Sequence, residues 1–356
     1  MEELIVVYID KEGKSRELEI EEDEKILDLS KKSITSIDLA TVVQIPNLKE
    51  LDLSSNALQE IDLSPLFHCS DLQKLSFFKN QLESIDLTPI GNLQNLEELN
   101  FGSNHLKSID LKPLRTLKSL KRLRLFNNGL DDIDLKPLEE CNSIEFLEIE
   151  NNSIQSIDLQ ATAKWISLVQ LNFMYNQLKE IDLSPLSNCT KLKFLYLHHN
   201  KLQSIDISPL QNCQDFRILR LGGNEIEEID LQPLSSCVEL RRLGLAMNKI
   251  LSLDLSPLAE AEHLSSLDIA GNRLTRIDLT PLEDCEELTE LYLFSDHPEE
   301  NEFDVLNISP LFSCLELEDF GVSDETDIHA DKKLQDEDDI PLAIEELIEE
   351  NRIKWV

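Results

Sequence analysis

A repeat of 24 residues runs through the chain and constrains its fold more than any other feature. The unit that begins at Leu48 follows the pattern L-x-x-L-x-L-x-x-N-x-L-x-x-I-D-L-x-P-L-x-x-C-x-x. Ten successive units carry asparagine at the ninth position: Asn56, Asn80, Asn104, Asn128, Asn152, Asn176, Asn200, Asn224, Asn248 and Asn272. A unit this short cannot bury its apolar face alone, so the period predicts an elongated stack of coils.

The first half of each unit has the pattern of a short strand. Outward and inward residues alternate at positions three to seven, as in Glu50, Leu51, Asp52, Leu53 and Ser54. Equivalent strands of stacked coils should form a parallel sheet with a spacing of about 4.8 Å.

The second half of each unit predicts a narrow helical turn. Ser64 as N-cap and Pro65 at the first helical position favour a helix start. The inward residues Leu66, Cys69 and Leu72 then follow at a spacing of three. That spacing indicates a 3₁₀ helix rather than a long α-helix.

Over residues 24–325 the pattern resembles the leucine-rich repeat family. The resemblance implies an α/β fold: a right-handed solenoid, or horseshoe, with a concave parallel β-sheet and short 3₁₀ or extended convex segments. In unit length and convex style it is similar to phosphatase-regulatory and internalin-type proteins. It also implies a protein-binding scaffold that uses the concave sheet.

The two ends depart from the repeat. Thirteen coils are expected, the first and last degenerate, with a five-residue insertion around residues 297–303. Residues 1–23 predict an N-terminal β-hairpin cap, because a solenoid must cover its open apolar end. Residues 326–340 are expected to be an acidic linker, and residues 341–356 a C-terminal helix. That helix is interpreted as a cap, with a detachable binding segment as the alternative, and its candidate docking residues are Leu342, Leu347, Ile348 and Trp355.

Charge limits the classes of partner. The chain has 33 Lys+Arg against 70 Asp+Glu, a formal net charge of -37. Nucleic acid and anionic membranes repel such a chain, so neither is expected as a partner. The N-terminus has no basic export signal, and no stretch approaches the length of a membrane span, so a cytoplasmic protein is expected.

Seven cysteines share one position of the unit: Cys69, Cys141, Cys189, Cys213, Cys237, Cys285 and Cys314. Other units hold apolar residues there, which predicts buried thiols without disulfides or zinc.

Eleven aspartates form a second ladder within the I-D-L triplets: Asp38, Asp62, Asp86, Asp110, Asp134, Asp158, Asp182, Asp206, Asp230, Asp254 and Asp278. Each can accept a backbone N–H in an Asx-turn, which would keep it ionised. Binding of divalent cations by this ladder is the alternative.

The outward strand positions change in the middle of the chain, where aromatic, arginine and methionine side chains replace small polar ones. These residue types dominate protein interfaces. The predicted partner-binding residues are Phe78, Arg122, Arg124, Phe126, Phe146, Glu148, Met174, Tyr175, Phe194, Tyr196, His198, Arg220 and Arg242.

The sequence thus predicts a non-enzymatic scaffold, expected to be monomeric, that binds a protein or peptide on its concave sheet. No catalytic, cofactor-binding or metal-binding motif is found, so no cofactor is expected. The alternative is an acidic chaperone that binds basic proteins such as histones through its acidic C-terminal region.

Overall fold

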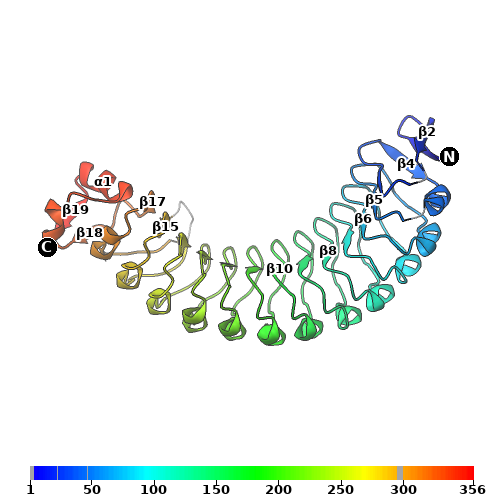
Figure 1. Ribbon diagram of the computed structural model, residues 1–356. Helices are drawn as coiled ribbons and strands as arrows, with labels where there is room; N and C mark the ends of the chain where they lie inside the picture. The colour runs from blue at the N-terminus through cyan, green and yellow to red at the C-terminus, as the bar shows by residue number, and fades with distance from the viewer. Residues whose placement is uncertain (1–3, 22, 46, 295–299) are drawn as a thin grey trace. The chain divides into compact units, whose positions relative to one another are not determined.

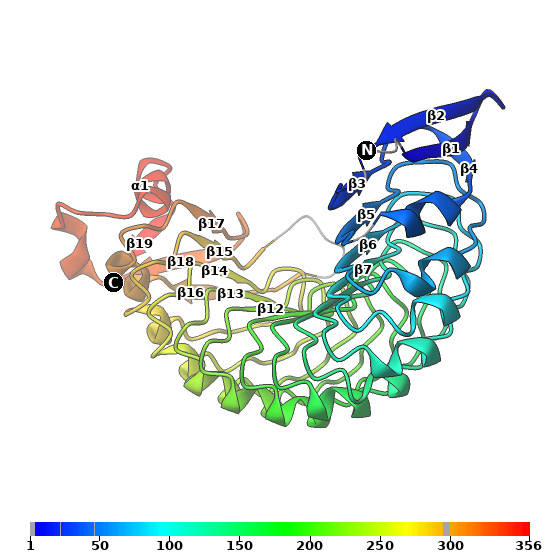
Figure 2. The same ribbon diagram turned by 45° about the vertical axis from the view of Figure 1, so that its right-hand side comes forward.

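The structure is a computed structural model that describes residues 4–21, 23–45, 47–294 and 300–356. The chain forms two compact units, Met1–Gln177 (unit 1) and Leu178–Val356 (unit 2). In each unit, short parallel strands line one face and 3₁₀ helices line the opposite face (Figure 1, Figure 2). Part of the expected insertion, residues 295–299, lies outside the described residues.

Three-residue strands form the parallel sheet of unit 1. They are β3 (Ile26–Asp28), β5 (Glu50–Asp52), β6 (Lys74–Ser76), β7 (Glu98–Asn100), β8 (Arg122–Arg124), β9 (Phe146–Glu148) and β10 (Gln170–Asn172). Neighbours pair in a register of 24 residues, so Glu50 lies opposite Lys74. The expected parallel sheet is therefore confirmed. The strands are shorter than the five residues predicted, because the chain turns after the fifth position.

The 3₁₀ helices of unit 1 begin at the end of the I-D-L triplet in η1 and directly after the triplet in the others. They are η1 (Leu39–Gln44), η2 (Ser64–His68), η3 (Thr88–Ile90), η4 (Lys112–Thr116), η5 (Lys136–Leu138) and η6 (Gln160–Lys164). In η2 the N–H of Leu66 donates to Leu63 and that of Cys69 to Leu66, both at 2.9 Å. These three-residue steps explain the spacing of the inward side chains. The N-cap is Leu63 rather than Ser64, and the Asp62 carboxylate accepts the Ser64 N–H at 2.8 Å.

Unit 2 repeats this arrangement. Its parallel sheet contains β11 (Phe194–Tyr196), β12 (Ile218–Arg220), β13 (Arg242–Gly244), β14 (Ser266–Asp268), β15 (Glu290–Tyr292) and β17 (Asp319–Gly321). Its repeat helices are η7 (Ser184–Asn188), η8 (Ser208–Asn212), η9 (Gln232–Ser236), η10 (Ser256–Leu258), η11 (Thr280–Leu282) and η12 (Ser309–Ser313). Each coil again buries its leucines between strand and helix.

An antiparallel sheet precedes the coils. Strands β1 (Leu4–Asp10) and β2 (Ser15–Ile20) form a hairpin, and β1 also pairs with β4 (Ile34–Ile37) of the first coil. Val6 and Ile20 are buried, so the hairpin packs on the apolar end of the stack.

The C-terminal region differs from the expected linker and helix. Strand β18 (Asp327–Ala330) pairs in parallel with β16 (Val305–Asn307) and β19 (Ile353–Trp355), and η13 (Lys332–Asp336) follows β18. Residues 326–340 thus contain ordered secondary structure, because β18 supplies a strand for its neighbours. Helix α1 (Leu342–Glu349) is shorter than predicted, since the chain returns as β19.

Two of the four predicted docking residues of α1 and β19 are half-buried. These are Ile348 and Trp355, and the Trp355 ring lies 6.1 Å from that of Phe312. Leu347 is buried as expected, whereas Leu342 is 53% exposed. Ala343 and Ile344 pack inward instead, because Leu342 lies on the outer side of the first helical turn.

The asparagine ladder joins each coil to the preceding one. The Asn248 side-chain oxygen accepts the Ile226 N–H at 3.0 Å, and its amide donates to the carbonyls of Leu221 and Leu245 at 3.1 and 2.9 Å. After the insertion Asn301 makes the equivalent bonds, including one from the Leu274 N–H at 2.9 Å. The register had placed Asp296 in this role, and that residue lies outside the described residues.

Candidate protein-binding face

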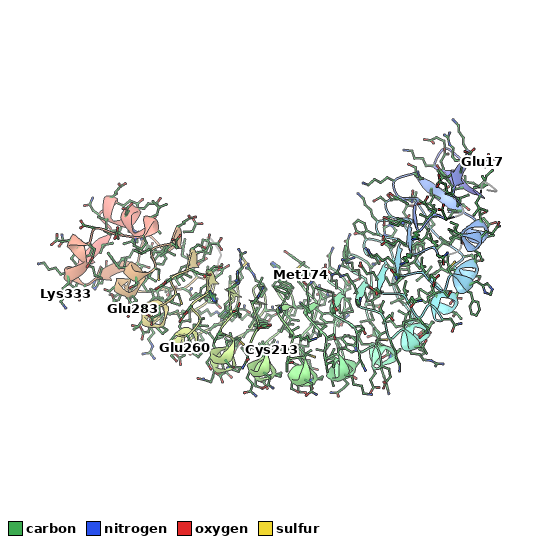
Figure 3. All side chains as sticks on the ribbon, viewed as in Figure 1. Glu17, Met174, Cys213, Glu260, Glu283 and Lys333 are labelled. Carbon is green, nitrogen blue, oxygen red and sulfur yellow. The ribbon has the colours of Figure 1, made fainter. Side chains whose placement is uncertain are left out.

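The predicted partner-binding residues lie on the side of the parallel strands that points away from the 3₁₀ helices. Strand residues alternate in burial, so that in β8 Leu123 is fully buried while Arg122 and Arg124 on either side are half-buried. Tyr175 and Arg242 are exposed, and the other eleven predicted residues are half-buried. Met174 marks this side of unit 1 in Figure 3.

Two phenylalanines of unit 1 come together across a glycine. The rings of Phe78 and Phe126 lie 5.8 Å apart, although their strands are separated by the strand that leads to Gly102. A Cβ on Gly102 would lie 2.6 Å from the Phe126 ring. The glycine therefore lets the ring lie flat on the backbone and form a small apolar surface.

The arginines of unit 1 already have partners within the chain. Arg124 Nε lies 2.6 Å from a Glu148 carboxylate oxygen, and the Glu98 carboxylate lies 3.7 Å from the same guanidinium. Arg122 lies over the Phe146 ring, with its guanidinium carbon 4.1 Å from the ring centroid. Both arginines thus lie near carboxylates of the chain itself, those of Glu98 and Glu148.

Glu150 lies near the same charged side chains, since the charges of Glu148 and Arg124 both act on its carboxyl. Burial raises the pKa of its carboxyl to about 7, and the charge of Glu148 acts in the same direction. Its Oε2 atom is buried and has no hydrogen-bond partner among the described residues. Glu150 therefore carries a proton much of the time near neutral pH.

The face of unit 2 combines aromatic rings with arginines. The rings of Phe194 and Tyr196 stack 6.5 Å apart, and His198 meets Tyr196 edge-on at 6.3 Å. Burial lowers the pKa of His198 to about 4, and His199 and Arg220 add to the effect. His198 is therefore neutral at physiological pH, and this surface stays partly apolar.

Arg220 and Arg242 lack the close carboxylate contacts of the arginines in unit 1, although the charge of Arg220 counteracts the rise that burial causes in the pKa of Asp268. Within the described part of the chain, no carboxylate lies within 4.0 Å of either guanidinium. The Arg220 side chain lies along the neighbouring strand, where a Cβ on Gly244 would be 2.9 Å from Arg220 Cδ. Both arginines lie close enough to Tyr196 to counteract the rise in its pKa, which burial causes. The side chains of Arg220 and Arg242 thus lie near the Tyr196 hydroxyl.

The repeat register could have revealed this difference, because residues 24 apart are neighbours on the sheet. That rule places Arg124 beside Glu148 but Arg220 beside Gly244. Gly244, which has no side chain to face Arg220, is the sequence signal for this difference.

The eighth position of the units has a left-handed backbone that the sequence did not predict. Its φ is 53° at Tyr175, 54° at His199 and 54° at Met247. Two other units carry glycine there, Gly223 and Gly271, which adopts this conformation without strain. The larger residues are retained at a conformational cost, as is common at functional positions.

The remaining candidates are structural. All seven cysteines are buried and free, and burial raises the pKa of Cys237, for example, to about 12. All eleven aspartates accept the backbone N–H two residues on, as Asp182 does from Ser184 at 2.8 Å. Over the described ranges, no group of three or more His, Cys, Asp or Glu side chains could hold a metal ion.

The family model for the leucine rich repeat matches residues 25–82, 142–202 and 190–250. The chain is a leucine-rich repeat protein. Comparison with curated proteins gave no match. Within the described residues, no helix of this leucine-rich repeat protein is long and apolar enough to span a membrane.

Solved structures of the same fold come from bacteria and plants. A leucine-rich repeat protein of Leptospira interrogans is 25% identical over 83% of this chain and 71% of its own, with a TM-score of 0.72. An internalin of Listeria monocytogenes is 24% identical over 86% and 90% of the two chains, with a TM-score of 0.63. A plant peptide hormone receptor, RGFR1, solved in complex with RGF2, is 19% identical over 95% of this chain and 57% of its own, with a TM-score of 0.70.

Proposed function

We propose that this leucine-rich repeat protein is a non-enzymatic scaffold that binds a protein or peptide on the face of its parallel β-sheet that points away from the 3₁₀ helices. The observation that carries the proposal is the pair Arg220 and Arg242 beside the half-buried ring of Tyr196, with no carboxylate of the described residues within 4.0 Å of either guanidinium. Binding energy at protein interfaces concentrates in such Arg and Tyr side chains. A plant peptide hormone receptor of the same fold, solved in complex with RGF2, supports protein or peptide binding as a use of the fold.

The bound segment is proposed to place an acidic group against Arg220 and Arg242 and apolar side chains against Phe194 and Tyr196. We further propose a monomer that works in the cytoplasm, where seven buried thiols stay reduced. Its net charge of -37 opposes binding to nucleic acid and anionic membranes.

Affinity capture from lysate of the native cell tests the proposal. Partners held by the wild type should be lost, by tenfold or more, with the triple variant Tyr196→Ala, Arg220→Ala and Arg242→Ala. A control carries Gln211→Ala, Gln214→Ala and Val238→Ala, three exposed positions away from the strands of the same unit. If the triple variant captures the same proteins in the same amounts as the control, the sheet face is not the binding surface.

A further inference from the structure

A basic depression lies on the 3₁₀-helix face of unit 1, opposite the sheet. It measures about 740 Å³ and is bordered by the helices η4 and η5. Four cations line it: Lys112, Arg115, Lys118 and Lys136. All four are exposed. A cluster of basic side chains is unexpected in a chain with 70 acidic and 33 basic residues.

The four cations share the depression with three carboxylates, Asp134, Glu139 and Glu140. Lys112 and Arg115 are three residues apart on η4, and side chains at that spacing eclipse in a 3₁₀ helix. Lys136 occupies the position equivalent to Lys112 on the next coil. In the part of the chain that the structure describes, none of the four lies within 4.0 Å of a carboxylate. Like charges held together in this way oppose one another unless an anion joins them.

The acidic residues at the rim are engaged elsewhere. Lys164 pairs with both Glu139 and Glu140, at 2.9 and 2.6 Å. Asp134 uses a carboxylate oxygen to accept the Lys136 N–H at 2.9 Å. Glu139 and Glu140 are thus held mainly by Lys164, while the charge of Lys118 also acts on Glu140 and lowers its pKa.

The basic character is specific to this place in the repeat. At the position of Lys112 and Lys136 the other units carry Ala, Ser, Thr or Gln, as at Ala40, Ser64, Thr88 and Gln160. On the corresponding helix face of unit 2 a depression of about 380 Å³ is acidic, with Glu260, Glu262, Asp284, Glu286 and Glu287. Glu260 and Glu283 mark that side of unit 2 in Figure 3. The repeat fold by itself therefore does not require basic residues at the positions of Lys112 and Lys136.

We infer that this basic depression binds an extended acidic segment of a partner protein, with carboxylates on alternate residues. The rise of a 3₁₀ helix sets Lys112 and Arg115 about 6 Å apart along the axis. Alternate side chains of an extended peptide are about 6.6 Å apart and lie on one side, so two carboxylates can meet two cations. Pro137 and the aliphatic parts of the lysines supply apolar contact between these charges. The net charge of -37 repels long polyanions, which favours a short acidic segment over nucleic acid.

Fluorescence anisotropy with a labelled peptide of sequence GSESESESG tests the inference on the full chain. The wild type should bind it and should bind the GSQSQSQSG analogue at least tenfold more weakly. The variant Lys112→Gln, Arg115→Gln, Lys118→Gln and Lys136→Gln should lose at least tenfold in affinity for the acidic peptide. Its control replaces Lys11, Lys179, Lys191 and Lys201 by Gln, which makes the same change in net charge at exposed sites and should cost less than twofold.

Several results would overturn the inference. They are no binding of the acidic peptide, equal losses in the two variants, or tighter binding of a 20-nucleotide single-stranded DNA at the same residues. Concentration-dependent self-association in sedimentation, abolished by the depression variant, would assign the site to a second copy of the chain. Each result leaves the sheet-face proposal standing, because Tyr196, Arg220 and Arg242 are unchanged in both variants.

Discussion

Glu150 is the residue at which the sheet face of unit 1 responds to pH. Its carboxyl is surrounded by half-buried neighbours, and one oxygen has no partner among the described residues. Ionisation in such surroundings costs solvation free energy, which is why its pKa reaches about 7. Between about pH 4.5 and 7 the folded chain therefore holds a proton that the unfolded chain releases.

The sign of the effect on stability follows from this difference. Below about pH 4.5, the ordinary pKa of the group, Glu150 is protonated in both the folded and unfolded states. As the pH rises to 7, the unfolded chain ionises freely while the folded chain does not, so the free energy of unfolding decreases. We expect Glu150→Gln to be more stable than the wild type by about 2 kcal/mol at pH 8, with no difference at pH 4.

Urea unfolding at several pH values measures this difference. Glu60→Gln, a change at an exposed carboxyl outside any described ion pair, is the matched control and should follow the wild type. A constant gap between Glu150→Gln and the wild type from pH 4 to pH 8 would rule out titration as its source.

At the scale of elements, the C-terminal strands and helix act as one closing unit. Helix α1 buries Ala343, Ile344 and Leu347, and the Ala343 N–H donates to the Leu317 carbonyl at 3.1 Å. Lys354 of β19 pairs with Asp327 of β18, and Arg352 pairs with Asp324. The acidic C-terminal region is therefore folded onto unit 2 in this structure.

Loss of the Ile344 side chain should loosen this closing unit. We expect Ile344→Ala to lower the free energy of local opening of β18, measured by amide hydrogen exchange, by about 3 kcal/mol, because it leaves a cavity under α1. The exposed neighbour Leu342→Ala should cost less than about 1 kcal/mol. Equal protection of β18 in both variants would mean that α1 does not hold the strands.

The period accounts for what could be predicted from the sequence. Leu51 and Leu75, 24 residues apart, face the same core because each coil repeats the environment of the last. The strand β18 could not be predicted, because its partner β19 lies outside the repeat. The raised pKa of Glu150 depends on how its neighbours exclude water, and the left-handed backbone at Tyr175 depends on the turn geometry. The pKa leaves no mark in the pattern of residue types, whereas Gly223 and Gly271 at the position of Tyr175 are the one sequence signal of the left-handed turn.

At the scale of the whole molecule, the net charge of -37 opposes the compact state. Eleven of the negative charges belong to the aspartate ladder, where hydrogen bonds from the Ser184 backbone and side chain, for example, lower the pKa of Asp182 and keep it ionised. Identical charges recur on every coil, so their repulsion is cumulative. Salt reduces this repulsion, because the Debye length falls from about 30 Å at 0.01 M to about 10 Å at 0.1 M.

We expect the thermal midpoint to rise by about 1 °C or more between 0.01 and 0.1 M NaCl, since about 1 kcal/mol of relieved repulsion shifts a chain of 356 residues by about 1 °C. Choline chloride should give the same rise. Calcium chloride at equal ionic strength should give no more, and a larger shift with calcium would indicate specific cation binding by the aspartates. A midpoint that falls with NaCl would show that attractive ion pairs dominate.

The asparagine ladder gives the chain a direction of assembly. Asn56 lies in one coil, yet its side-chain oxygen accepts the N–H groups of Lys32 and Ile34, both at 3.0 Å, in the preceding coil. Each coil thus receives its last internal bonds from residues about 22 positions later in the chain. During synthesis a coil that has left the ribosome stays incomplete until the next one follows, so a nascent chain always carries one unfinished coil at its growing end.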